Sequence, residues 1–163
     1  MRRPSRLLLT LAAAISALVL VPVAADAGSS GGHEQHGALL KSGLVGSTAP
    51  LEGGVALFEV VPGGRTWAVR DGAVKVTRDG RLDVRIKGLV IPEAPFNGTN
   101  PLASVSATLV CNDVPGTPTA TVPLSTAGDG RIRADVVVPQ PCLAPAVLVN
   151  PLGNGATYIA ANG

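Results

Sequence analysis

The chain has 163 residues, of which 13 are Lys or Arg and 11 are Asp or Glu, and its net charge is +2. This balance gives no electrostatic reason to bind DNA, RNA or an anionic membrane, because such partners are recognised through an excess of basic residues. Aromatic residues make up only 2% of the chain, so a row of aromatic side chains that stacks bases or sugars is not expected either.

Residues 1–27 have the arrangement of a cleavable secretory signal. Basic residues precede an apolar stretch over residues 7–21, and small residues flank a cleavage site after Ala27. A retained membrane anchor is the alternative, but the stretch is shorter than the roughly 20 residues that a spanning helix needs. Arg2 and Arg3 leave the twin-arginine route open beside the general secretory route. We therefore expect an exported chain that is secreted or wall-associated and no longer attached to the membrane after cleavage.

The next segment predicts a flexible leader over residues 28–50, ahead of a folded domain over residues 51–163. Gly and Ser dominate its beginning, which offers no apolar surface to a core. Residues 38–54 add scattered Leu and Val, a pattern that allows an early edge strand. Cleavage after residue 27 would leave ten basic and ten acidic residues, so the exported chain would be neutral.

The leader contains both histidines of the chain, His33 and His36, which are weak candidates for a Zn²⁺ or Cu²⁺ site. Their spacing is one residue shorter than that of the His-Glu-x-x-His motif, which favours a solvated tail. A Ser-His-Asp or Cys-His enzyme would need this leader to supply its base. No cofactor is expected.

The remaining chain has the two-residue periodicity of strands. Residues 81–87 alternate apolar and charged side chains, and residues 131–136 repeat the pattern, as expected of strands with one buried and one wet face. Strands are predicted over residues 67–70, 73–78, 81–87, 103–111, 131–138, 147–150 and 157–160.

Asp-Gly and Asn-Gly pairs separate several of these strands, at residues 71–72, 79–80, 129–130 and 154–155. Such pairs are typical of tight hairpin turns, and the first two predict a three-stranded meander over residues 66–87. We expect an all-β domain, a single antiparallel β-sandwich of Ig-like or Greek-key type with seven to nine short strands. A partly closed β-barrel is the alternative.

Cys111 and Cys142 are the only cysteines, and an even count in an exported chain predicts a disulfide. A redox or nucleophilic thiol would need a second Cys or a base close by in the sequence, and neither is present.

No catalytic residue is assigned. The chain has neither a Gly-x-Ser-x-Gly nucleophile motif nor a phosphate-binding Gly-Lys-Ser/Thr loop. Most acidic residues fit turns or outward strand positions; Glu59 lies in an apolar run, where an edge or outward position is the favoured interpretation. Trp67 is expected in the core. The irregular loop over residues 91–101 supplies the candidate contacts, which are Phe96, Asn97 and Asn100.

Several runs in the later part of the chain carry a resemblance: Gly-Thr-Asn-Pro from Gly98, the strand that ends at Cys111, Pro-Cys-Leu-Ala-Pro around Cys142, and Tyr-Ile-Ala-Ala from Tyr158. With these runs the chain resembles small secreted actinobacterial proteins of unknown function. The resemblance implies export and paired cysteines, and it implies no activity and no functional residue.

We therefore expect a secreted, non-enzymatic binding or envelope-associated module whose partner is an unknown protein or a cell-wall polymer, and not a nucleic acid or a membrane. The alternative is a secreted carboxylate-dependent hydrolase that acts on cell-wall or extracellular polymer.

Overall fold

Strands account for nearly all regular structure in the computed structural model, which describes residues 37–163. The all-β prediction is confirmed. The signal segment and the candidate metal ligands His33 and His36 lie outside the described residues. The strands are β1 (Ala38–Gly46), β2 (Val61–Pro62), β3 (Asp71–Thr77), β4 (Arg81–Lys87), β5 (Ser104–Cys111), β6 (Val114–Pro115), β7 (Val122–Pro123), β8 (Gly130–Asp135), β9 (Ala146–Pro151), β10 (Thr157–Tyr158) and β11 (Ala160–Asn162), with a short 3-10 helix η1 (Pro50–Glu52) after β1.

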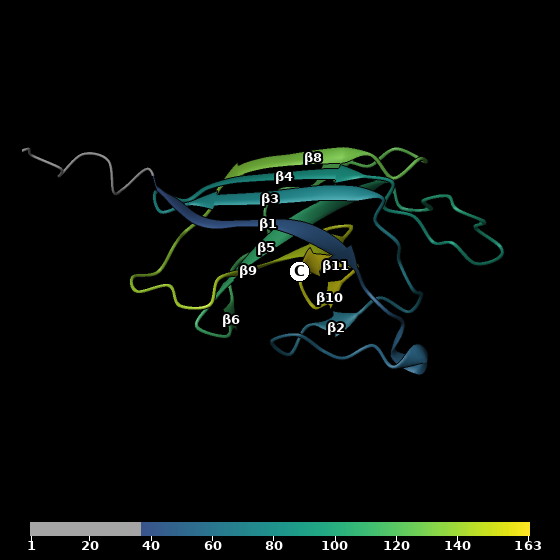
Figure 1. Cartoon of the computed structure of the whole chain (residues 1–163), viewed down its shortest axis with the longest axis horizontal. Coiled ribbons are helices and arrows are strands. Elements are labelled where there is room, and N and C mark those ends of the chain that lie inside the picture. The colour runs from purple at the N-terminus through teal and green to yellow at the C-terminus, as the bar shows by residue number, and fades with distance from the viewer. Residues whose placement is uncertain (1–36) are drawn as a thin grey trace, which may run out of the picture.

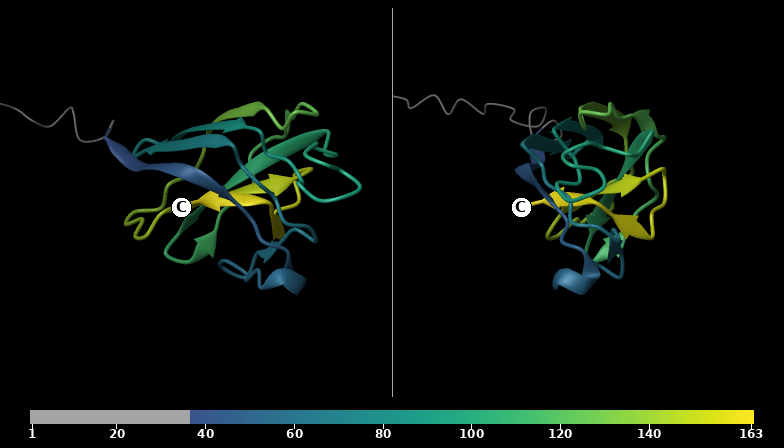
Figure 2. Two further views of the ribbon diagram at one scale, coloured as in Figure 1. Left: turned by 45° about the vertical axis from the view of Figure 1, so that its right-hand side comes forward. Right: turned by 90° about the vertical axis from the view of Figure 1, so that its right-hand side faces the viewer.

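One antiparallel sheet contains most of these strands, in the order β6-β5-β9-β11-β1-β3-β4-β8, with β7 paired to β5. The sheet curls into a half-barrel, so that β1, β3, β4 and β8 lie side by side over β5 and β9, which cross them obliquely (Figures 1 and 2). The short strands β2 and β10 form a separate parallel pair.

The main core fills the space between the two halves of the sheet. Val76, Val84 and Ile132 point inward from neighbouring strands of the first half, and Val105 and Val149 face them from the second. Alternation along each strand produces this arrangement, because successive side chains of a strand point to opposite faces. Trp67 is buried in this core, as predicted.

A second, smaller core covers the other face of β5 and β9. Val110 and Leu148 pack there against Val60 and Tyr158, whose hydroxyl donates to the carbonyl of Val55 at 2.7 Å. The polar side of β5, which carries Ser106 and Thr108, is therefore buried as well. Thr108, on that side, donates a hydrogen bond to the Asn150 side chain at 2.7 Å.

Strand β1 corrects the predicted domain boundary at residue 50. It pairs with β3 along one edge and with β11 along the other, so it lies inside the sheet and is neither leader nor edge strand. Leu44 points from β1 into the main core. The Gly and Ser content of this segment concealed a strand whose leucines, Leu39, Leu40 and Leu44, all contribute to the main core.

The predicted turn at Asp71-Gly72 is wrong, and with it the first strand of the meander. Both residues belong to β3, where they pair with Lys87 and Ile86 of β4. A Cβ atom on Gly72 would lie 2.7 Å from the Cβ of Leu44, so the glycine provides space for close packing.

The other turn signals lie at strand ends. Asp79-Gly80 joins β3 to β4 as predicted, with Gly80 at φ +89°. Asp129 precedes β8, and its carboxylate accepts a hydrogen bond from the Gly88 N–H at 2.9 Å. After β9, the residues with positive φ are Leu152 and Gly153.

The predicted disulfide between Cys111 and Cys142 is confirmed. It connects the end of β5 to the segment that follows β8, which are 31 residues apart in the sequence. Residues 37–163 contain no helix with the length and apolar character needed to cross a membrane.

Candidate functional site

The outer face of β1, β3, β4 and β8 gathers most of the basic residues of the described chain. Pairing places the outward residues in rows that cross the strands, such as Lys41, Lys75, Asp83 and Arg133. The next row contains Ala73, Arg85 and Arg131. We call this surface the basic face; its charged residues are Lys41, Lys75, Arg81, Arg85, Lys87, Arg131, Arg133, Asp71, Asp83 and Asp135.

Seven of these side chains are basic and three are acidic, which gives the basic face a net charge of +4. The other described residues include three basic and six acidic side chains, so the rest of residues 37–163 has a net charge of −3. The charge balance of the whole chain therefore conceals a strongly asymmetric surface. The inference that the chain offers no electrostatic attraction to an anionic partner does not hold for this face.

Asp83 holds two arginines near the centre of the face. Its carboxylate accepts two hydrogen bonds from Arg131, one of them from Nε at 2.9 Å, and lies 3.9 Å from Nε of Arg133. The hydrogen bonds from Arg131 lower the pKa of Asp83, and the charges of Arg131, Arg85 and Arg133 lower it further against the opposing effect of burial. Asp83 therefore stays ionised and cannot act as a general acid near neutral pH.

Other cations of the face form no ion pair with the described residues. Four basic residues take part in no ion pair within residues 37–163: Lys41, Lys75, Arg85 and Lys87. Lys41 and Lys75 stand directly opposite each other on β1 and β3. Like charges in that position destabilise a sheet, and a bound anion would relieve their repulsion.

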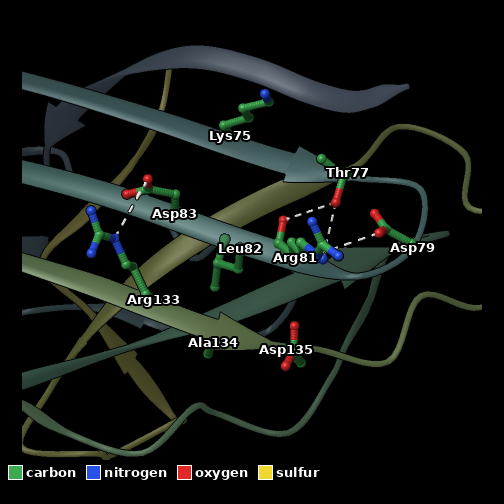
Figure 3. Close-up of a pocket in the computed structure, with 9 residues that line it drawn as sticks. All are labelled: Lys75, Thr77, Asp79, Arg81, Leu82, Asp83, Arg133, Ala134 and Asp135. Atoms are coloured by element: carbon green, nitrogen blue, oxygen red, sulfur yellow. Dashed lines mark hydrogen bonds and ion pairs between the residues drawn. The ribbon is translucent and has the colours of Figure 1, made fainter. Parts of the chain in front are cut away.

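Two shallow hollows lie on the basic face. The larger, of about 530 Å³, runs over β3, β4 and β8 and is drawn in Figure 3. There Lys75, Asp83 and Arg133 extend from three neighbouring strands on the same side of the sheet, with Asp83 between the two cations. The second, of about 430 Å³, adjoins it over β1, β3 and β4 and is lined by Lys41, Lys75 and Arg85.

The loop residues proposed as contacts are not equivalent. Phe96 is half-buried and packs against the main core, and Asn97 is exposed. Asn100 is only 4% exposed, and its amide donates to the carbonyls of Leu102 and Ser125 and accepts from the Leu102 N–H. Asn100 is therefore a structural residue that holds the loop, because its polar atoms are already used inside the protein.

Glu59 is exposed in a tight turn between Leu57 and Val60, which fits the outward position favoured from the sequence. No group of three or more potential metal ligands is found among residues 37–163.

Comparison with protein-family models, with curated proteins and with solved structures finds no match for this chain. The resemblance to secreted actinobacterial proteins therefore stays a prediction.

The basic face was missed in the sequence even though its signal is present there. The alternation in residues 81–87 and 131–136 already puts every charge of these two strands on one face. The missing information was pairing, because only the register brings β1, β3, β4 and β8 together with their charged sides aligned.

Proposed function

We propose that this protein is an exported, non-enzymatic binding module that attaches to an anionic polymer of the cell envelope through its basic face. The observation that carries the proposal is the net charge of +4 on one face of four neighbouring strands, with four cations that form no ion pair within residues 37–163. An exported chain would meet such polymers; the signal-like composition of residues 1–27 supports export, and the disulfide is compatible with it.

The shape of the basic face favours an extended ligand over a small molecule. Its two hollows are shallow and adjoin each other across the strands. Four neighbouring strands span about 14 Å, and successive outward residues of one strand are about 7 Å apart. Cations at this spacing contact several charges of a chain polymer at once, which raises the total affinity although each exposed contact is weak.

The carboxylate-dependent hydrolase gains no support from this face. Asp83 is the acid nearest its centre, and Arg131 lowers its pKa, whereas a general acid needs a raised pKa. Arg131 and Arg133 also occupy its carboxylate. Binding through the cations is therefore the function that the geometry supports best.

Co-sedimentation with isolated cell walls tests this proposal. One wall preparation keeps its phosphodiester and carboxylate polymers, and a second is stripped of them. The variant Lys75→Gln/Arg85→Gln removes two cations of the face that form no ion pair within residues 37–163. Arg65→Gln/Arg78→Gln removes two such cations from outside the face as a matched control. At about 1 kcal/mol for each basic residue near an anionic surface, the first variant should bind roughly 30-fold more weakly.

We expect the wild type and the control variant to sediment with the intact walls and to be released by high salt, since exposed charges are screened. Equal binding to stripped walls would contradict the proposal. Tighter binding to duplex DNA than to the wall polymer at the same salt concentration would indicate a nucleic-acid partner instead.

A further inference from the structure

Strand β8 has one edge that no described strand covers. It ends the sheet and pairs only with β4 within residues 37–163. The N–H of Val136 bonds to the carbonyl of Gly80 at 2.8 Å, toward β4. Because the backbone polar groups of successive residues alternate between the two edges of a strand, those of Arg131, Arg133 and Asp135 point away from β4, to the open edge.

A largely apolar groove begins at the Asp135 end of this open edge and continues beside the residues that follow β8. Its volume is about 890 Å³, and it separates residues 134–139 from residues 109–120, which belong to the other half of the sheet. Leu109, Pro115 and Pro118 line the far wall, and Val136 lines the near wall. The half-barrel is thus left unclosed here, and the gap lies where one more strand would continue the sheet.

Contacts fix both ends of the open edge of β8 and the groove beside it. At the Gly130 end the N–H of Ser125 bonds to the Asp129 carbonyl at 3.0 Å, which brings the β7 segment onto β8. At the other end the disulfide joins the two walls. Asn112 adds hydrogen bonds from its amide to the Pro141 carbonyl and from the Leu143 N–H to its side-chain oxygen, both at 2.8 Å. The groove is therefore a preformed site that loses little freedom when it is filled.

The alternation of β8 determines what fits there. A strand added to its edge would present every second side chain on the same side as Arg131 and Arg133, and the others on the side of Ala134 and Val136. The first set meets the exposed guanidinium groups of Arg131 and Arg133 and, at the end of β8, the carboxylate of Asp135, where a neutral side chain is expected. The second set meets the side of β8 on which the apolar groove begins. The two faces of the bound segment must therefore differ in chemistry.

We propose that β8 accepts an extended peptide segment of a partner protein in which acidic and apolar residues alternate. The segment completes the sheet along β8, places its acidic side chains against Arg131 and Arg133, and buries its apolar side chains in the groove. This second site takes a different ligand from the polymer of the proposed function, although Arg131 and Arg133 also belong to the basic face.

The probe is the synthetic peptide acetyl-Thr-Val-Glu-Val-Glu-Val-Thr-amide, which presents the same pattern in either strand direction. A control peptide of the same composition groups the residues as Val-Val-Val-Thr-Glu-Glu-Thr. Binding to the purified chain is measured by fluorescence anisotropy. We expect the alternating peptide to bind at least tenfold more tightly than the grouped one.

Backbone methylation tests strand pairing without any change in the protein. In an antiparallel pairing, which all strands of the main sheet use, the Glu amides of the probe face β8. Methylation of these two nitrogens should therefore abolish binding, whereas methylation of two Val nitrogens should weaken it far less. In the protein, Arg133→Gln should weaken peptide binding about fivefold. Lys75→Gln/Arg85→Gln should leave it within twofold, which separates a failure of this site from a failure of polymer binding.

Three results would overturn this inference. One is equal affinity for the alternating and grouped peptides, and another is equal loss with either methylation pattern. The third is a dimer in sedimentation velocity whose β8 amides are protected from hydrogen exchange, because a second copy of the chain would then occupy the edge.

Discussion

Asp83 is the residue around which the basic face is organised. It is the outward residue at the middle of β4, and Arg131 and Arg133 from β8 both reach its carboxylate. Lys75 stands opposite it on β3. A single acid thus restrains two arginines while reducing the positive charge that the face offers to an anion.

Substitution Asp83→Asn keeps the size of this side chain and removes its charge. We expect affinity for an anionic polymer to rise about fivefold, because the face gains one unit of positive charge. Thermal stability should fall slightly, since the ion pair is largely exposed. Titration with a soluble phosphodiester polymer, beside Asp135→Asn as a variant at the edge of the same face, measures the first effect; a loss of affinity would contradict this account.

The pH dependence of stability follows from the same contact. The pKa of Asp83 is lower in the folded chain than its ordinary value of 3.8, so its contribution is present above about pH 4 and is lost as the pH falls through the folded-state pKa. The difference in thermal midpoint between wild type and Asp83→Asn should therefore be constant near neutral pH and disappear in acid.

At the scale of elements, the packing of β3 against β1 depends on a glycine that the turn rules misassign. Gly72 lies inside β3 against Leu44 of β1, although Asp-Gly is a strong turn signal. Close approach of two strands and a tight turn both require the absence of a side chain. The local pattern cannot distinguish these causes, because the contact with Leu44 is made across the sheet.

Substitution Gly72→Ala tests this explanation. Its Cβ would lie 2.7 Å from the Cβ of Leu44, and overpacking of this kind costs about 1–3 kcal/mol. Gly43→Ala on the neighbouring strand is the matched control, since its Cβ would make an ordinary contact at 3.7 Å with the Gly72 carbonyl. Chemical denaturation should show a clear loss of stability for the first variant only. Equal stabilities of the two variants would contradict the close packing of Gly72 against Leu44.

Much of the element pattern could be predicted because it is local. The alternation over residues 81–87, the Asp79-Gly80 turn and the pairing of Cys111 with Cys142 were all correct. The position of β1 was not, because its Gly and Ser content resembles a leader and its partners β3 and β11 come later in the chain. Asn100 was misjudged for a related reason, since its partner Ser125 is distant in sequence.

At the scale of the whole molecule, the main property is the separation of charge. A count over the chain gives near neutrality, whereas the fold puts +4 on one face and −3 on the remaining described surface. This separation depends on sheet order and register, which place four charged strand faces next to one another. In the field of a polyanion, such a separation turns the basic face toward the polymer and the acidic remainder away from it.

The most direct test is to map the binding surface by NMR during titration with a short, soluble phosphodiester polymer. We expect amide shifts to change along β1, β3, β4 and β8, most strongly around Lys75, Asp83 and Arg85, and to weaken as salt is added. Changes confined to the loop around Phe96, or no change at low salt, would contradict the claim that the basic face is the binding site.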